Sequence, residues 1–258
     1  MFFDMSKLLL AVLFGSVMLL SGCAEQPREI NKRLAAEMPG KILWAWERPE
    51  DLRFIDPKQF GVAYLAQTLY LQSNDVLFRP RRQSLEVLPE TYLIAVTRIE
   101  TAKDAAIRAQ LSDEQRERLI KFIKRSLERP NVRGIQIDFD VVVSERKFYK
   151  NLVIELQKQL APAITLTVTS LASWCVGDAW FSDFPIDEAV PMIFRMGADA
   201  GQVRSFLAAG SDWNEPLCHG SYGISTDEPL NVKFRENRRI YYFNPKAWEK
   251  SDVEKLDQ

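Results

Sequence analysis

Two carboxylates at the end of a short apolar segment are the residues of this chain best suited to acid–base chemistry. The segment runs from Val132 to Asp140 and closes with Asp138-Phe139-Asp140. Carboxylates two positions apart on one face of a strand repel each other, so the pKa of one should rise and that of the other should fall. Such a split lets an acid and an ionised partner coexist near neutral pH, as glycoside hydrolysis requires. The alternative is a salt-bridge network in which Arg98 or Arg195 is the counter-ion.

The alternation of side chains along this segment predicts which face holds the carboxylates. Successive side chains of a strand point to opposite faces. One face therefore carries Ile135, Ile137 and Phe139, and the other carries Gly134, Gln136, Asp138 and Asp140. A strand that is apolar on one face and acidic at its C-terminal end fits a (β/α) barrel, in which active sites lie at that end of the strands.

The rest of the chain predicts strands that alternate with a few helices. The expected strands are 41–46, 61–65 with an extension to 71, 91–98, 132–140, 164–170, 188–194, 218–224 and 239–243. Residues 76–78 and 85–88 flank an arginine-rich segment and predict a hairpin insertion. Ser112 and Gln115 form a capping-box pattern that begins a helix, and Pro130 ends it. Ser144 is expected to cap a second helix, whose buried row is spaced by four residues: Phe148, Leu152, Leu156 and Leu160. Further helices are expected at 200–209 and 251–257.

This order of elements predicts an α/β fold, namely an irregular, abbreviated (β/α)8 barrel of the TIM type. Residues 41–258 are slightly fewer than the 250 or so of a usual barrel, and the early connections read as loops rather than helices. The alternative is an open doubly wound sheet. That fold usually has a Gly-rich phosphate loop after its first strand, where this chain has Trp44-Ala45-Trp46-Glu47-Arg48-Pro49.

Several further side chains near strand ends are candidate ligand contacts. The tryptophans at 44, 46, 174, 180 and 248 offer flat apolar faces for a sugar, and we expect at most two of them to line a cleft. Glu47 and Glu228 are candidate second carboxylates, or they cap loops or form salt bridges. Asn244 either hydrogen-bonds a ligand or makes a turn before Pro245. Gln136 and Arg195 complete the candidate substrate-binding set.

The N-terminus has the pattern of an exported, lipidated protein. Lys7 precedes an apolar run of about 13 residues, which is shorter than the 20 or so that span a bilayer. The run therefore predicts a signal peptide, residues 1–22. Leu20-Ser21-Gly22-Cys23 resembles the lipobox of bacterial lipoproteins. This resemblance implies that Cys23 carries the acyl chains, palmitate among them, and that residues 23–40 are an anchor and tether. Ala24, rather than Asp, implies the outer membrane, facing the periplasm.

Composition excludes several functional classes. The 34 basic and 35 acidic residues balance, so nothing favours a nucleic-acid partner. His219 is the only histidine, so no His-rich metal centre or ordinary catalytic triad is expected, and no cofactor motif is present. Cys175 and Cys218 could form a disulfide in an oxidising periplasm or remain separate buried thiols, and the sequence leaves both open.

Dispersed motifs resemble a family of uncharacterised bacterial lipoproteins, known only as a domain of unknown function. The resemblance covers residues 41–250 or so. It rests on Trp44–Arg48, Gly134–Asp140, Leu171–Cys175, Glu188–Met192, Phe194–Gly197, Ser225–Pro229 and Tyr242–Pro245. This family implies no known activity.

A second, local resemblance concerns the acidic strand. Gly134–Asp140 is similar to the fourth barrel strand of family 18 chitinases and related glycosidases, which reads Asp-x-x-Asp-x-Asp-x-Glu. Asp140 stands where that family has its proton-donating Glu, Asp138 stands at the preceding Asp, and Gln136 replaces the Asp before it. The shorter Asp140 would set the proton donor back by about 1 Å, a displacement that can cost 10²-fold in rate.

Three hypotheses follow from these patterns. The first is a lipid-anchored periplasmic glycoside hydrolase or transferase that acts on envelope or imported glycans, with Asp140 as acid and Asp138 as partner. The second is a barrel that binds a glycan or a protein without catalysis. The third is a structural lipoprotein whose acidic strand pairs with arginines. Open space in front of Asp140, with a second carboxylate about 5–9.5 Å away, would favour the first hypothesis over the second. If Arg98 or Arg195 fills that space, binding or a structural role is favoured.

Overall fold

The barrel predicted from the sequence is present and is closed. A computed structural model of the chain describes residues 37–178 and 180–257. Within these residues eight parallel strands follow one another around the barrel: β1 (Lys41–Ala45), β3 (Phe60–Gln72), β6 (Leu93–Thr101), β7 (Val132–Asp138), β8 (Thr165–Leu171), β9 (Glu188–Met192), β10 (Ser221–Ser225) and β11 (Arg239–Phe243). Strand β1 pairs with β3 on one side and with β11 on the other, so the sheet has no gap, and the open doubly wound alternative is wrong.

The barrel interior is filled by side chains, as a small barrel requires. Its apolar part includes Ile42, Trp44, Ile94, Val96 and Tyr241, all buried. Met38 packs in the same cluster, so core contacts begin before Lys41. The opposite faces of the strands pack outward against helices and loops. The interior is therefore a packed core that can hold a ligand only at its ends.

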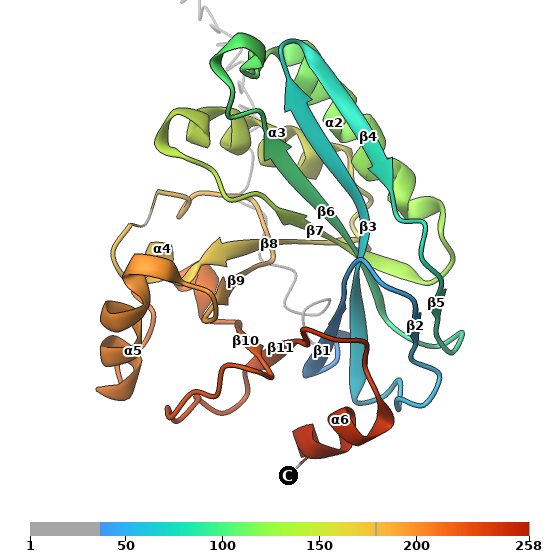
Figure 1. Cartoon of the computed structure of the whole chain (residues 1–258), viewed down its shortest axis with the longest axis vertical. Helices are drawn as coiled ribbons and strands as arrows, with labels where there is room; N and C mark the ends of the chain where they lie inside the picture. Colours follow the sequence, from blue (N-terminus) through green and yellow to red (C-terminus); the bar gives the residue numbers. More distant parts are fainter. Residues whose placement is uncertain (1–36, 179, 258) are drawn as a thin grey trace, which may run out of the picture.

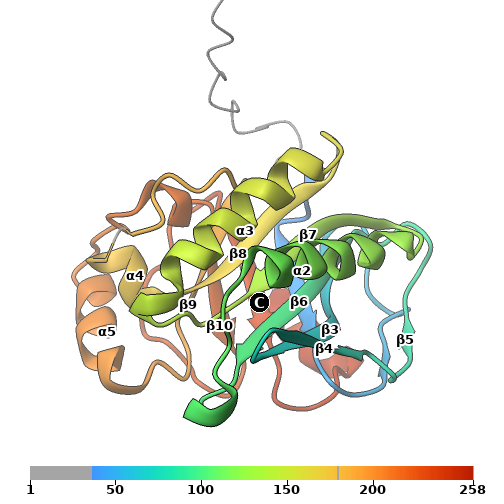
Figure 2. The same cartoon turned by 90° about the horizontal axis from the view of Figure 1, so that it is seen from above.

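Two long helices cover the outer face beside the acidic strand, as expected (Figure 2). Helix α2 (Asp113–Arg125) begins with the predicted capping box, in which Ser112 and Gln115 bond each other's backbone. Helix α3 (Arg146–Gln159) buries the predicted row from Phe148 to Leu160. The predicted Ser144 cap is wrong, because a 3-10 turn at Val143–Glu145 precedes the helix and Glu145 occupies the cap position.

The remaining connections contain only short helices or none, which makes the barrel abbreviated. Helices α4 (Ala172–Val176) and α5 (Ala200–Ala208) follow β8 and β9. No α-helix lies between β1 and β3, β3 and β6, or β10 and β11 in the described part of the chain. Helix α6 (Lys250–Glu254) follows β11, and the nearby Trp248 indole donates to the Trp44 carbonyl. None of the described helices is long and apolar enough to cross a membrane.

The predicted hairpin between residues 76–78 and 85–88 is wrong. Strand β4 (Asp75–Pro80) instead pairs antiparallel with β3 through a tight turn at Ser73, whose φ is +46°. Strand β5 (Leu85–Glu86) pairs with β2 (Glu50–Asp51). The Arg81 guanidinium donates to the carbonyls of Ala45 and Trp46. These bonds draw the chain after β4 toward β1 and away from its own hairpin.

Strands β3 and β6 continue beyond the mouth of the barrel. The pairing of β6 with β7 ends at Arg98 and Asp138, whereas its pairing with β3 continues to Leu71 and Thr101. Strand β4 flanks this extension (Figure 1). We call the part of β3, β4 and β6 beyond Asp138 the mouth wall. It stands beside the place where the acidic strand ends.

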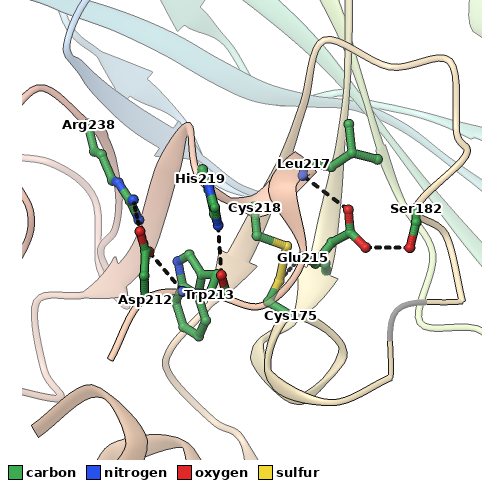
Figure 3. The surroundings of a disulfide bond; sticks show 10 residues. Cys175, Ser182, Asp212, Trp213, Glu215, Leu217, Cys218, His219 and Arg238 are labelled. Atoms are coloured by element: carbon green, nitrogen blue, oxygen red, sulfur yellow. Dashed lines mark hydrogen bonds and ion pairs between the residues drawn. A yellow bond between two sulfur atoms is a disulfide. The ribbon is translucent and has the colours of Figure 1, made fainter. Parts of the chain in front are cut away.

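Cys175 and Cys218 form a disulfide, with their Cα atoms 6.1 Å apart (Figure 3). The sequence alone leaves this bond open, because Cys175 follows the top of β8 while Cys218 comes before β10. Cys218 is not in a strand as predicted but in a 3-10 turn, Pro216–Cys218. The backbone amides of Asn214 and Glu215 donate to the Cys175 carbonyl. These bonds hold the segment before β10 against α4, which brings the sulfurs together.

Candidate functional site

A cavity of about 250 Å³ opens at the C-terminal end of the barrel strands. Residues at or just beyond the ends of β1, β7, β8, β9 and β11, together with Arg98 within β6, contribute to its lining. The side chains that line it include Trp44, Trp46, Arg98, Asp138, Asp140, Thr169, Phe194, Arg195, Asp199 and Phe243. Active sites of barrels of this type lie at this end, so the cavity is the candidate site.

Asp138 is the innermost carboxylate of the cavity. It is the last residue of β7, points into the barrel and is 8% exposed. The Thr169 hydroxyl on the neighbouring strand donates to its Oδ1 at 2.7 Å. Burial, and then the charge of Asp140, raise the pKa of Asp138 to about 6, against the opposing effects of the Thr169 hydrogen bond and Arg98. Asp138 therefore exchanges a proton close to neutral pH.

Asp140 lies just past the end of β7, exposed at the mouth of the cavity. Removal of water by the surrounding protein raises its pKa, and the Arg98 charge partly offsets this increase. The prediction that one pKa would rise and the other fall is wrong. Both rise, because each carboxylate loses water and Asp140 adds repulsion to Asp138.

The arginines proposed as counter-ions of these aspartates are engaged elsewhere. The Nε of Arg98 lies 2.8 Å from Oε1 of Glu100. Arg195 lies 3.6 Å from Asp227, and its guanidinium sits 4.9 Å from the centre of the Phe243 ring. Within the described residues no ion pair involves Asp138 or Asp140. The two arginines line the cavity but do not fill it, so the salt-bridge interpretation is not what the structure shows.

Trp44 forms the aromatic floor of the cavity and is held by hydrogen bonds. Its Nε1 donates to Oε1 of Gln136 at 2.8 Å, and Nε2 of Gln136 donates to Thr167 at 3.3 Å. Gln136 is fully buried, so it supports Trp44 rather than lining the cavity. Gly223 completes the support, because a Cβ there would lie 2.9 Å from the Trp44 ring. The indole thus has a defined orientation before any ligand binds.

Other aromatic rings form one side of the cavity. Phe194 and Phe243 stack at 5.3 Å, and Trp46 meets Phe243 edge-on at 6.4 Å. Of the five tryptophans considered from the sequence, Trp44 and Trp46 line the cavity, in agreement with the expected maximum of two. The other three pack elsewhere: Trp174 and Trp180 with the aromatic cluster around Tyr149, and Trp248 on the outside of β1.

Three predicted candidates lie away from the cavity. Glu47 borders a separate, smaller hollow beside Arg79 and Arg82. The Glu228 carboxylate accepts from the backbone amide of Arg195 at 3.2 Å. That bond stabilises Arg195 in its left-handed backbone conformation, with φ of +51°. Asn244 is buried and accepts from the Thr226 hydroxyl at 2.8 Å. The contacts of Glu228 and Asn244 are structural in this arrangement.

The cavity also contains residues that the sequence patterns do not predict. Asp199, at the end of the turn Gly197–Asp199, adds a third carboxylate. Phe194 and Phe243 add aromatic surface, and Thr169 bonds Asp138. The alternation of β8 had placed Thr169 on the same face as Thr167, which was a usable signal. Asp199 lies in a loop, where no periodicity indicates direction.

The surroundings of the single histidine and the clusters of metal-binding side chains were the remaining places for a candidate centre in the described residues. No group of three or more His, Cys, Asp or Glu side chains there could hold an ion. His219 lies by the disulfide, where its Nε2 is 2.7 Å from the Trp213 carbonyl (Figure 3).

Comparison with known proteins adds little to this geometry. No family model and no curated protein matches the chain. Among solved structures, the crystal structure of the Bacillus cereus spore cortex-lytic enzyme SleL is similar, at 15% identity and a TM-score of 0.46. The match covers 71% of this chain and 50% of that one, so the chain spans about half the length of SleL. The resemblance to a lipoprotein family remains a prediction.

Proposed function

We propose that this chain is a lipid-anchored envelope protein that binds a glycan in the cavity and hydrolyses it with Asp140 and Asp138. One observation carries the proposal. A buried aspartate with a pKa of about 6 stands beside a second aspartate in a cavity whose floor and side are aromatic. Carboxylates supply the acid that glycoside hydrolysis needs, and aromatic rings supply flat apolar faces for sugars.

In the proposed reaction Asp140 delivers the proton, because it is the more accessible of the two carboxylates. The proton passes to the glycosidic oxygen as the bond to the anomeric carbon breaks. Water adds to that carbon, and its proton returns to the Asp138–Asp140 pair. Asp138 helps because it binds a proton near neutral pH and thereby keeps one available to Asp140. Trp44 would hold the sugar ring against this pair.

A non-catalytic glycan-binding protein is the second candidate, and one observation favours it. Gln136 replaces a carboxylate of the family 18 pattern, and both ends of its amide form hydrogen bonds within the barrel, to Trp44 and Thr167. The acidic row of that pattern is thus interrupted, and Asp140 is one methylene shorter than the glutamate of that pattern. In this case the aspartates would hydrogen-bond sugar hydroxyls, and the cavity would bind without turnover.

The substitution Asp140→Asn separates these candidates. If Asp140 is the acid, reducing-end release from a panel of envelope polysaccharides should fall by about 10²–10⁴-fold, while binding persists because an amide still forms hydrogen bonds. The melting temperature should stay within a few degrees of wild type, because no cation depends on Asp140 for an ion pair. Asp183→Asn, which alters an exposed aspartate paired with Lys150, is the matched control.

Each result has a distinct meaning. Binding without release by the wild-type protein would establish the non-catalytic candidate. Equal release by wild type and Asp140→Asn would remove Asp140 from the mechanism. A loss of about 3–5 kcal/mol in the free energy of unfolding, as large as that of a broken buried ion pair, would revive the structural interpretation.

The anchor belongs to the same proposal. Cys23 and the signal peptide lie outside the described residues. The described chain enters the barrel at its N-terminal end, where Met38 packs inside, and the cavity lies at the opposite end. A tether attached there supports an arrangement in which the cavity faces away from the bilayer, toward the periplasm.

The substitution Cys23→Ser tests the anchor. It should release the protein from the membrane fraction, because stable attachment requires the acyl chains. Cell fractionation followed by immunoblotting measures this, with the wild-type protein and a known soluble periplasmic protein as references. If Cys23→Ser remains in the membrane fraction to the same extent, the lipid anchor is wrong.

A further inference from the structure

A second hollow adjoins the cavity at the mouth of the barrel. Its volume is about 470 Å³, and its lining includes Tyr70, Glu100 and Lys103. Arg98, Asp138 and Asp140 line both hollows. The two aspartates therefore stand between the hollows, rather than at the closed end of a single one.

The mouth wall forms one side of this second hollow. Tyr70 on β3 and Glu100 on β6 lie directly opposite each other in the pairing of these two strands, beyond the point where β7 ends. The Thr101 hydroxyl donates to Oε1 of Glu145 at 2.7 Å, which ties the wall to the connection that follows Asp140. The wall is thus held in place next to the carboxylates before a ligand arrives.

The two hollows differ in chemistry. The first has the aromatic side chains of Trp46, Phe194 and Phe243. The second is polar, and Arg98 in it is already paired with Glu100. The Arg79 guanidinium lies 5.8 Å from the centre of the Tyr70 ring, and the Tyr70 side chain remains partly exposed. Lys103 is exposed and forms no ion pair with any described residue, so its ammonium group is available to a ligand.

From this arrangement we propose that the substrate is a chain of several sugars that crosses both hollows, with the bond to be cleaved above Asp138 and Asp140. Tyr70 and Lys103 hold the units that lie along the mouth wall. This inference rests on the proposed function. It deepens that function by assigning an internal bond of a polymer rather than a single terminal sugar. At about 250 Å³ the first hollow alone is smaller than the 300–1,000 Å³ of usual ligand sites, which supports occupation of both.

Binding measured against chain length tests this inference. Dimers, tetramers and hexamers of β-1,4-linked N-acetylglucosamine, and peptide-free peptidoglycan strands of matched lengths, would be titrated by calorimetry into the Asp140→Asn protein, which prevents turnover. In at least one series the hexamer should bind about tenfold more tightly than the dimer, a difference typical of added sugar–protein contacts. Tyr70→Ala and Lys103→Ala should each narrow that difference by about threefold or more. Lys121→Ala, on the exposed face of α2, is the matched control and should leave the difference unchanged.

The outcomes separate this inference from the function on which it rests. Equal affinity for dimers and hexamers, or a length effect that Tyr70→Ala and Lys103→Ala do not alter, would overturn the inference and leave glycan binding intact. Failure of every oligomer in both series to bind would overturn the inference and the proposed function together. Circular dichroism of the Tyr70→Ala variant would show whether the mouth wall still folds. If it does not fold, the Lys103→Ala variant still tests the inference, because Lys103 is exposed and its truncation should not affect folding.

Discussion

At the scale of single residues, the protonation of Asp138 is the main property of the site. The carboxylate is buried and stands beside a second carboxylate, and its one hydrogen-bond donor, Thr169, does not compensate for the lost water. An aspartate with a pKa of about 6 carries a proton for part of the time at neutral pH. Thr169 therefore orients the carboxylate without forcing it to ionise, which suits a group that must exchange a proton.

The same property predicts how stability depends on pH. The pKa of Asp138 is higher in the folded protein than in the unfolded chain. The contribution of this group to stability is therefore complete below pH 3.8, and it is lost as the pH rises through about 6. Asp138→Asn cannot ionise, so relative to wild type it should gain up to about 3 kcal/mol between pH 4 and pH 8. Urea denaturation at both pH values measures this. Glu117→Gln, on the exposed face of α2, controls for the loss of one charge. Parallel pH profiles for Asp138→Asn and wild type would refute the raised pKa.

At the scale of elements, the two faces of strand β7 have different roles: one faces the barrel interior and the other packs against the helices. Its inner face presents Gln136 and Asp138 to the barrel interior, where they support Trp44 and line the cavity. Its outer face and the residue that follows it, Phe139, are buried in the large cluster beneath α2 and α3. The Phe139 ring meets Tyr149 of α3 edge-on at 5.2 Å. Packing on the outer face thus determines where the carboxylates on the inner side point.

Truncation of that outer contact should therefore be costly. Phe139→Ala removes a ring that is 2% exposed, and we expect a loss of about 3–5 kcal/mol in the free energy of unfolding. Val143→Ala in the same connection changes a side chain that is 74% exposed, and should cost less than about 0.5 kcal/mol. Chemical denaturation compares the two. A loss below 1 kcal/mol for Phe139→Ala would mean that the faces of β7 are assigned incorrectly.

At the scale of the whole molecule, closure depends on contacts between distant segments. Strand β1 pairs with β3, which follows it in the sequence, and with β11, which lies near the end of the described chain. The Trp248 indole, also near that end, donates to the Trp44 carbonyl. The half of the barrel from β8 to β11 has short helices. There the Cys175–Cys218 disulfide links α4 to the segment before β10, and both cysteines are buried in the main cluster (Figure 3).

Loss of the disulfide should destabilise this half of the barrel. The cysteines are 43 positions apart, and closing a loop of that length contributes about 4 kcal/mol in the chain-entropy model. Cys218→Ser should lower the midpoint of urea denaturation accordingly. Wild-type protein in reducing agent should match the variant, whereas the variant itself should not respond to reducing agent. A wild-type midpoint that does not depend on the reducing agent would show that the bond is absent in solution or contributes nothing.

Periodicity and local hydrogen bonding were enough to predict much of this architecture. The period-two pattern of residues 134–139 assigned both faces of β7, and the row from Phe148 to Leu160 assigned the buried face of α3. The Ser112–Gln115 capping box marked the start of α2. Each of these signals is local, because it depends on residues within a few positions of one another. Such patterns can be recognised in a single sequence.

Only the tertiary structure decided the features that depend on distant partners. Arg81 redirects the chain after β4 because its bonds are to carbonyls about 35 residues away. Asp199 lines the cavity because of the path that its loop takes. Glu228 and Asn244 form structural hydrogen bonds that no sequence pattern predicts. The pKa of Asp138 follows from burial among strands brought together by folding. The sequence by itself thus determined the elements and the two carboxylates. Which side chains surround those carboxylates was decided when the barrel closed, because closure places residues far apart in the chain around one cavity.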